Sequence, residues 1–153
     1  MTFQETKTFQ GISNYEIPIG HLRYFGNHSG QTIHKSYKID QKEDENNLYI
    51  SVLTIGELHK GIEKLDESRR KEELHNWVEN DLKERFWTRI IDIDLQTAVV
   101  WGKIQGMTER VGKPMPAIDS LIAATGIAHH LTVVSRNTSD MKESGVALIN
   151  PWE

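Results

Sequence analysis

From residue 48 to its end, the chain alternates short apolar runs with longer segments of helical periodicity. The apolar runs with the length of buried strands are 48–53, 89–93, 131–135 and 146–149. The segments with apolar residues three and four positions apart are 54–65, 68–86, 95–111 and a fourth that begins near Pro116. Strands that alternate with helices of this length predict an α/β protein with a mostly parallel sheet.

Residues 1–47 have a different texture. They are rich in Gly, Asn, Gln, Thr and His, and their apolar residues follow no sustained period. Their best strand candidates, at 15–17 and 37–39, are both short. We therefore expect a divergent N-terminal segment over residues 1–47 and one α/β domain over residues 48–153.

Composition excludes several classes of protein. The chain has no cysteine, which rules out disulfides and thiolate metal sites. Its first residues, MTFQETKTFQ, lack the apolar run of a secretory signal, and no window reaches the ~20 apolar residues of a membrane span. A net charge of −4 argues against a broad surface that follows nucleic-acid phosphates. We expect a cytoplasmic protein.

Four polar residues occupy the positions where such a fold collects its functional groups. Glu57 follows the strand at 48–53, Asn137 and Asp140 follow the strand at 131–135, and Asp119 opens a helix. In parallel α/β sheets, binding sites form at the carboxyl ends of the strands. The topology therefore predicts that Glu57, Asn137 and Asp140 lie near one another.

Each of these residues also has an ordinary structural reading. Thr54 and Glu57 have the spacing of a capping box, with Thr54 as the N-cap and the Glu57 carboxylate bonded back to it. Asp119 suits the positive end of a helix dipole. Asn137 and Asp140 are common turn residues. No single residue of the four is specific for a metal.

The remaining polar candidates point away from nitrogen or sulfur ligands. No pair of histidines has metal-ligand spacing with a convincing secondary-structure element beneath it, and His59 is expected on an exposed helical turn. Arg136 could contact a phosphate or form a salt bridge. Oxygen ligands without cysteine or paired histidine favour Mg²⁺ or Mn²⁺. The chemistry served by such a cluster is phosphodiester hydrolysis.

Taken together, the segments resemble a known family. The matching text is LYISVLTIGELHKGIEKL at 48–65, IIDIDLQTAVVWGKI at 90–104, GKPMPAIDSLIAATGIAHHLTVVSRNTSDM at 112–141 and GVALINPW at 145–152. In this order, they resemble the PIN-domain ribonucleases, especially the VapC-like toxins of bacterial type II toxin–antitoxin pairs. The combined motifs are far more specific than any one of them.

The resemblance implies a fold, a reaction and partners. The fold would be a three-layer α/β/α sandwich with a mostly parallel central sheet. Glu57, Asp119, Asn137 and Asp140 would be the catalytic residues and would bind Mg²⁺ or Mn²⁺, and water activated by the metal would hydrolyse RNA. The family also implies an RNA substrate, a cognate antitoxin and a homodimer.

The chain departs from this family at its front. Members begin with an apolar strand that ends in Asp-Thr-Asn and supplies both the central strand and the first metal ligand, and residues 1–47 contain no such motif. Asp40 follows a weak strand candidate but lies too close to Glu57 for the helix and loop that the family places between them. Two functions stay open: an active endoribonuclease, or a catalytically impaired PIN domain that acts by binding an antitoxin or RNA. A generic α/β protein with coincidental acids is disfavoured by the density of motifs.

Overall fold

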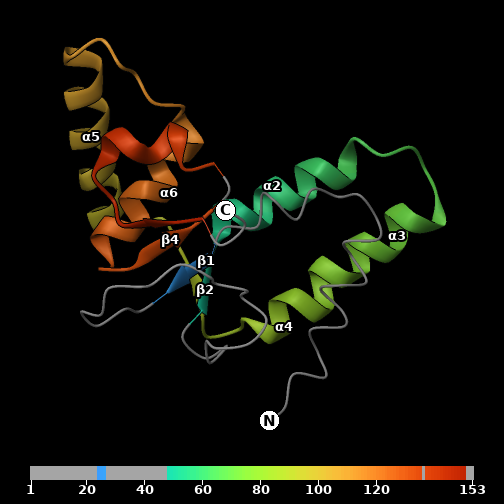
Figure 1. Cartoon of the computed structure of the whole chain (residues 1–153). Coiled ribbons are helices and arrows are strands. Elements are labelled where there is room, and N and C mark those ends of the chain that lie inside the picture. Colours follow the sequence, from blue (N-terminus) through green and yellow to red (C-terminus); the bar gives the residue numbers. More distant parts are fainter. Residues whose placement is uncertain (1–23, 27–47, 136, 151–153) are drawn as a thin grey trace.

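The strands that the structure describes form one mixed sheet. The computed structural model describes residues 24–26, 48–135 and 137–150. Within them lies a five-stranded sheet with the order β3-β2-β1-β4-β5. Figure 1 shows β1, β2 and β4 of this sheet beside one another. The strands are β1 (Tyr24–Gly26), β2 (Leu48–Ser51), β3 (Ile90–Ile91), β4 (Thr132–Val134) and β5 (Leu148–Ile149).

Strand β1 holds the centre of this sheet and runs against its neighbours. It pairs antiparallel with β2 on one side and with β4 on the other, whereas β2 pairs parallel with β3 and β4 with β5. The four outer strands therefore share one direction, and β1 alone among the described strands opposes it. The predicted mostly parallel α/β sheet is confirmed, and a short antiparallel strand occupies its middle.

Helices connect the outer strands. Their bounds are α2 (Val52–Glu63), α3 (Arg69–Asn76), η3 (Trp77–Leu82), α4 (Lys83–Arg85), α5 (Leu95–Arg110), α6 (Ala117–Ala128) and η4 (Ser139–Ser144). The predicted helix over 68–86 is a continuous helical stretch in which η3 is π-helical. Ser68 caps its start by accepting a hydrogen bond from the amide of Lys71 (3.2 Å).

The junction between β2 and α2 differs from the sequence prediction. The strand ends at Ser51, whose hydroxyl accepts a hydrogen bond from the amide of Leu53 (3.1 Å) and caps the helix. Helix α2 thus begins three residues before the position predicted, and Thr54 lies inside its first turn. The predicted capping box between Thr54 and Glu57 is therefore wrong, and Glu57 lies in the second turn.

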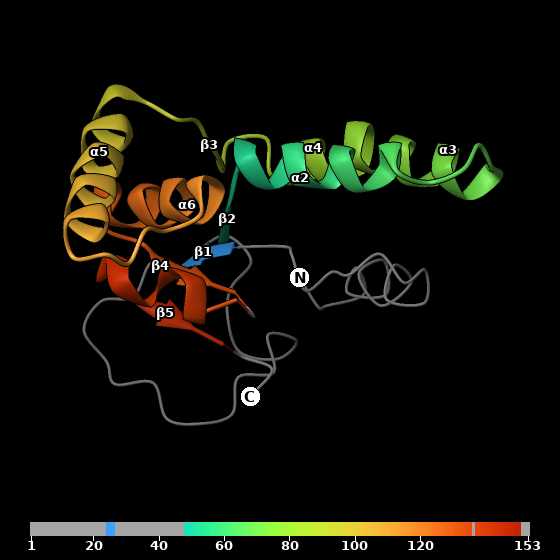
Figure 2. The same ribbon diagram turned by 90° about the horizontal axis from the view of Figure 1, so that it is seen from above.

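Side chains alternate between the two faces of the sheet, and each face carries its own core. Ile50 and Val134 pack with buried residues of α2, α3, η3 and Phe86, whereas Val133 packs with residues of α5, α6 and η4. Figure 2 shows α5 and α6 on one side of the strands and α2 to α4 on the other. This arrangement confirms the α/β/α layers. Within the described residues, no helix has the length and apolar character needed to cross a membrane.

Gly126 sets how closely α6 packs on β4. A Cβ atom at this position would lie 2.8 Å from Cγ2 of Val133, 2.9 Å from Cγ2 of Val146 and 3.2 Å from the carbonyl oxygen of Leu131. Real Cβ contacts are longer, so a side chain here forces the helix and strand apart. The absence of a side chain at Gly126 therefore fixes the height of α6 above the sheet.

We expect Gly126→Ala to lower the free energy of unfolding by about 1–3 kcal/mol, the usual cost of overpacking a core. Gly106→Ala in α5 is the matched control, because nothing lies within 4 Å of its added Cβ. That variant should gain up to about 1 kcal/mol from helix propensity. Urea denaturation of both variants measures the difference, and equal stability of the two would contradict the close packing at Gly126.

Candidate active site

The carboxyl ends of β2 and β4 lie at one edge of the sheet, on either side of β1. Tyr24 pairs with Ile50 of β2 and with Val134 of β4, so these two residues are level across the central strand. Two strand spacings separate them, about 10 Å. Ser51 and Ser135 follow them and are fully buried. Helix α2, which follows β2, and the turn that follows β4 therefore both start at this edge.

The turn after β4 brings Asn137 and Asp140 into contact. Ser135 Oγ accepts a hydrogen bond from the Asn137 amide (3.0 Å), which fixes the start of the turn. The side-chain Nδ2 of Asn137 donates to Asp140 Oδ2 (2.7 Å). Ser139 Oγ lies 3.4 Å from both Asn137 Oδ1 and Asp140 Oδ1. Asp140 is exposed, so the turn presents a carboxylate and an amide oxygen together at the surface.

Asp119 lies in the first turn of α6, as predicted, and is 7% exposed. Helix α6 turns directly into β4, and the Leu131 amide donates to the carbonyl of Gly126 (2.8 Å) across this reversal. Because α6 runs back over the sheet in this way, its first turn lies toward the end where β4 finishes. Asp119 is therefore a buried carboxylate near the same end of the sheet as the turn after β4.

The residue after Asp119 locks this first turn to α5. Ser120 Oγ accepts hydrogen bonds from Trp101 Nε1 (3.0 Å) and from Gln105 Nε2 (2.6 Å), and donates to the carbonyl of Ala117 (2.9 Å). Ser120 is fully buried. Sequence reasoning did not single out Ser120, because a serine inside an apolar helix carries no local signal. Its hydrogen bonds fix the backbone that carries Asp119.

Glu57 has one carboxylate oxygen whose surroundings call for a partner. The side chain is half-buried in α2, and its Oε2 atom is shielded from solvent with no hydrogen bond from the described residues. A buried carboxylate oxygen without a partner is costly. The corrected helix start removes the capping role that sequence reasoning had offered. A cation at this oxygen fits the site.

The acids share an edge of the sheet without forming one tight cluster. Among the described residues, the carboxylate oxygens of Glu57, Asp119 and Asp140 do not all come within 4.8 Å of one another. Carboxylates that approach one another repel unless a cation neutralises them. Their oxygen donors suit a hard cation such as Mg²⁺ or Mn²⁺.

The direction of β1 is relevant to the Asp-Thr-Asn motif, which the sequence lacks. Tyr24, its first residue, lies at the edge that carries the acids, and its carboxyl end, Gly26, lies at the opposite edge. The 23 residues before β1 contain no aspartate. An aspartate placed directly after β1, as in Asp-Thr-Asn, would therefore lie at the opposite edge from the acids. Asp40 and Arg136 lie outside the described residues.

Sequence reasoning missed a second group of potential metal ligands. His59, His75 and Glu79 present ligand atoms that all lie within 4.8 Å of one another. The sequence expectation concerned the spacing of histidines along the chain, whereas this group is brought together by folding. His59 and His75 come from different helices, so no local spacing reveals them. The one local signal is that His75 and Glu79 are four residues apart, on one face of a helix.

Known proteins match both the sequence and the fold. The model of the PIN domain matches residues 25–143. The toxin FitB of Neisseria gonorrhoeae is 34% identical over 105 residues, which cover 69% of this chain and 76% of that protein. The VapC ribonuclease Y4jK of Sinorhizobium fredii is 30% identical over 106 residues, with the same shares of 69% and 76%. The crystal structure of FitAcB from Neisseria gonorrhoeae has a TM-score of 0.69 at 32% identity, covering 72% of this chain and 80% of that one.

Proposed function

The chain belongs to the PIN-domain family, and on this basis we propose that it is a Mg²⁺- or Mn²⁺-dependent endoribonuclease, the toxin of a toxin–antitoxin pair. The observation that supports the proposal is that Glu57, Asn137 and Asp140 follow the carboxyl ends of β2 and β4, while Asp119 lies buried in the first turn of α6. Oxygen donors of this kind suit a hard divalent cation. The orphaned Oε2 of Glu57 supports a cation at this edge.

Each residue has a distinct part in this proposal. Glu57, Asp119 and Asp140 would hold the metal through carboxylate oxygens, and Asn137 would assist through Oδ1. The metal, when bound, supplies an activated water and neutralises charge on the phosphodiester. Asn137 orients Asp140 by donating to its Oδ2 (2.7 Å). The hydrogen bonds to Ser120 hold the turn that carries Asp119 in place.

The proposed partners are RNA, a cognate antitoxin and a second copy of the chain. Structures similar to this one are described as FitAB bound to a DNA fragment (TM-score 0.68, 31% identity) and as VapBC2 from Rickettsia felis bound to a promoter fragment (0.57, 27%). Helix α5 and its end expose Leu95 (81%), Val99 (50%), Met107 (52%) and Val111 (61%). Exposed apolar surface of this kind supports a protein-binding role. We place the protein in the cytoplasm, with no membrane partner.

An impaired PIN domain is the second candidate function. Its support is the reversed β1 and the absence of aspartate from the 23 residues before it, so that β1 does not carry the family's first aspartate to this edge. Fewer charged ligands weaken the binding of a hard metal. In that case the chain would act by binding the antitoxin or RNA, without cleavage.

Metal removal separates these two functions. We expect the purified protein to cleave a mixed pool of single-stranded RNAs in Mg²⁺ or Mn²⁺, to stop in EDTA, and to recover when the metal is restored, because the proposed reaction needs the metal to activate water. Gel electrophoresis of end-labelled RNA measures the products. Cleavage that persists in EDTA would contradict a metal-dependent reaction. A folded protein that cleaves nothing in either metal would favour the impaired form.

A further inference from the structure

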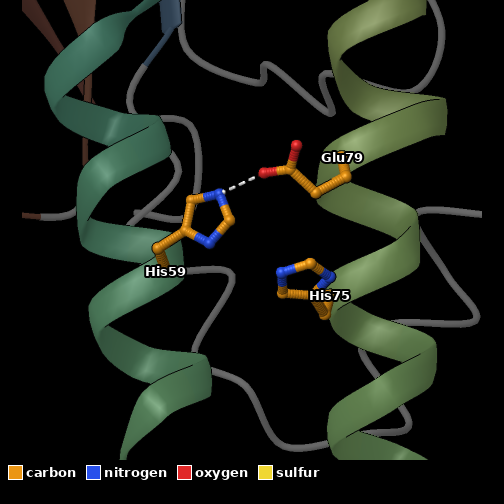
Figure 3. A group of neighbouring side chains, drawn as sticks. All are labelled: His59, His75 and Glu79. Carbon is orange, nitrogen blue, oxygen red and sulfur yellow. Dashed lines mark ion pairs between the residues drawn. The ribbon is translucent and has the colours of Figure 1, made fainter.

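A second set of ligand side chains lies between α2 and the helical stretch of α3 and η3. Figure 3 shows the imidazoles of His59 and His75 and the carboxylate of Glu79 turned toward one another. His59 Nε2 lies 2.8 Å from Glu79 Oε1. The two imidazole rings are 5.7 Å apart between centroids, at 72° to each other. Three potential ligands thus converge from two helical segments.

The core beneath fixes this convergence. Each of the three residues directly follows a buried apolar residue of the same core cluster: Leu58, Leu74 and Val78. The packing of these anchors sets the distance between the two helical segments. Because the anchors are buried, the residues that follow them are held at the rim of the core. The group is therefore positioned by packing and does not depend on flexible surface side chains alone.

The backbone between two of the ligands is unusual. The π-helical segment η3 begins at Trp77, after His75 and before Glu79. π-helical turns inside an α-helix are rare, and they occur frequently at functional sites. This irregularity is independent of the side-chain cluster and falls at the same place.

We propose that His59, His75 and Glu79 form a second metal site, for a borderline transition metal such as Zn²⁺. Two imidazoles and one carboxylate are a common protein ligand set for zinc, and leave a fourth position open. Tetrahedral coordination at the usual bond lengths places ligand atoms about 3.3 Å apart. His59 Nε2 and Glu79 Oε1 lie 2.8 Å apart and would separate slightly around a metal, and all three ligand atoms lie within 4.8 Å of one another, so small side-chain movements would complete the coordination.

Lys83 prepares Glu79 for this role. Its Nζ donates to Glu79 Oε2 (2.8 Å), which leaves Oε1 directed at His59. Metal-binding carboxylates are commonly oriented by a hydrogen bond of this type. Lys83 does the same here for the carboxylate of η3.

The group without a metal would be an ion-pair network, which is the competing explanation. The hydrogen bond from Lys83, followed by the charges of Lys83, His59 and His75, holds the pKa of Glu79 below its ordinary value. Such a network would link the helices with no ligand. It predicts no saturable uptake of Zn²⁺, whereas a metal site requires it.

The proposed site is separate from the acidic edge. His59 and Glu57 are two residues apart on α2, about 200° around the helix, so they face opposite sides. The donors differ too, since imidazole nitrogens favour Zn²⁺ over the Mg²⁺ that oxygen ligands prefer. Zn²⁺ bound by both α2 and the stretch of α3 and η3 would stabilise the packing of these helices against each other.

Titration of the full chain with Zn²⁺ in excess Mg²⁺, followed by calorimetry, tests the site. We expect saturable binding that weakens about tenfold or more in His75→Gln and in Glu79→Gln, since each removes one ligand. His130→Asn is the matched control: it removes an imidazole outside the group at a positive-φ position that asparagine tolerates, and should bind as wild type. Co²⁺ in place of Zn²⁺ should give visible absorption bands that both ligand variants lose.

Two results would overturn the site. One is the absence of saturable Zn²⁺ binding by the wild-type chain. The other is binding by His75→Gln and Glu79→Gln that equals wild type. Circular dichroism checks that each variant is folded. His75 is exposed, so His75→Gln carries the test if Glu79→Gln loses its structure.

Discussion

Asp119→Asn is expected to lose RNA cleavage by about a thousandfold or more, because a lost metal contact costs several kcal/mol in the transition state. Asparagine has the size of aspartate and lacks its charge, so the buried position in the first turn of α6 is filled while the metal loses a ligand. The fold should survive, since Ser120 and its hydrogen bonds to α5 are untouched. Initial rates of RNA cleavage measure the loss.

Asp94→Asn is the matched control for this variant. Asp94 caps α5, where its Oδ1 accepts a hydrogen bond from the amide of Thr97 (2.7 Å), and asparagine caps helices equally well. The control removes the same charge at a distance from the proposed site. It should therefore cleave RNA as wild type does. Unchanged cleavage by Asp119→Asn would remove Asp119 from the mechanism.

Phe25→Pro is expected to unfold the domain or to destabilise it by at least about 2 kcal/mol. Phe25 is the middle residue of β1, paired with Tyr49 on one side and with Val133 on the other. Proline has no amide hydrogen, so it breaks the ladder in the centre of the sheet and leaves a partner carbonyl unsatisfied. Urea denaturation measures the change in the free energy of unfolding.

The control for this variant is Phe25→Ala, which removes the side chain and keeps the backbone amide. The difference between the two variants isolates the contribution of the ladder. If proline and alanine gave the same stability, β1 would not be a paired central strand. The comparison therefore tests the feature that most distinguishes the front of this chain.

The central strand is also the element that sequence reasoning could not place. The alternation of strands and helices after residue 48 could be predicted, because buried strands and amphipathic helices each have a recognisable hydrophobic pattern. Tyr24–Gly26 is three residues long and has no pattern of its own. Its position depends on pairing with β2 and β4, which lie far along the chain. Strand formation of this kind is set by tertiary context.

The sequence predicted the local positions of most candidate site residues, and the predicted start of the helix that carries Glu57 was wrong. The position of Asp119 in the first turn of its helix and the joining of Asn137 to Asp140 follow from topology and turn chemistry. The helix start was misplaced because Ser51 and Thr54 are both good N-caps, and the apolar Val52 and Leu53 between them suit a strand or a helix. The His59 group joins two helices, so only folding reveals it.

Titration with Mn²⁺ tests whether the acidic residues bind a metal. We would use His75→Gln as the background, so that the second proposed site contributes little, and compare it with the same chain carrying Asp119→Asn as well. We expect saturable Mn²⁺ binding in the first protein and its loss in the second. Equal binding by both, or no binding by the first, would contradict a metal centre at the acidic edge.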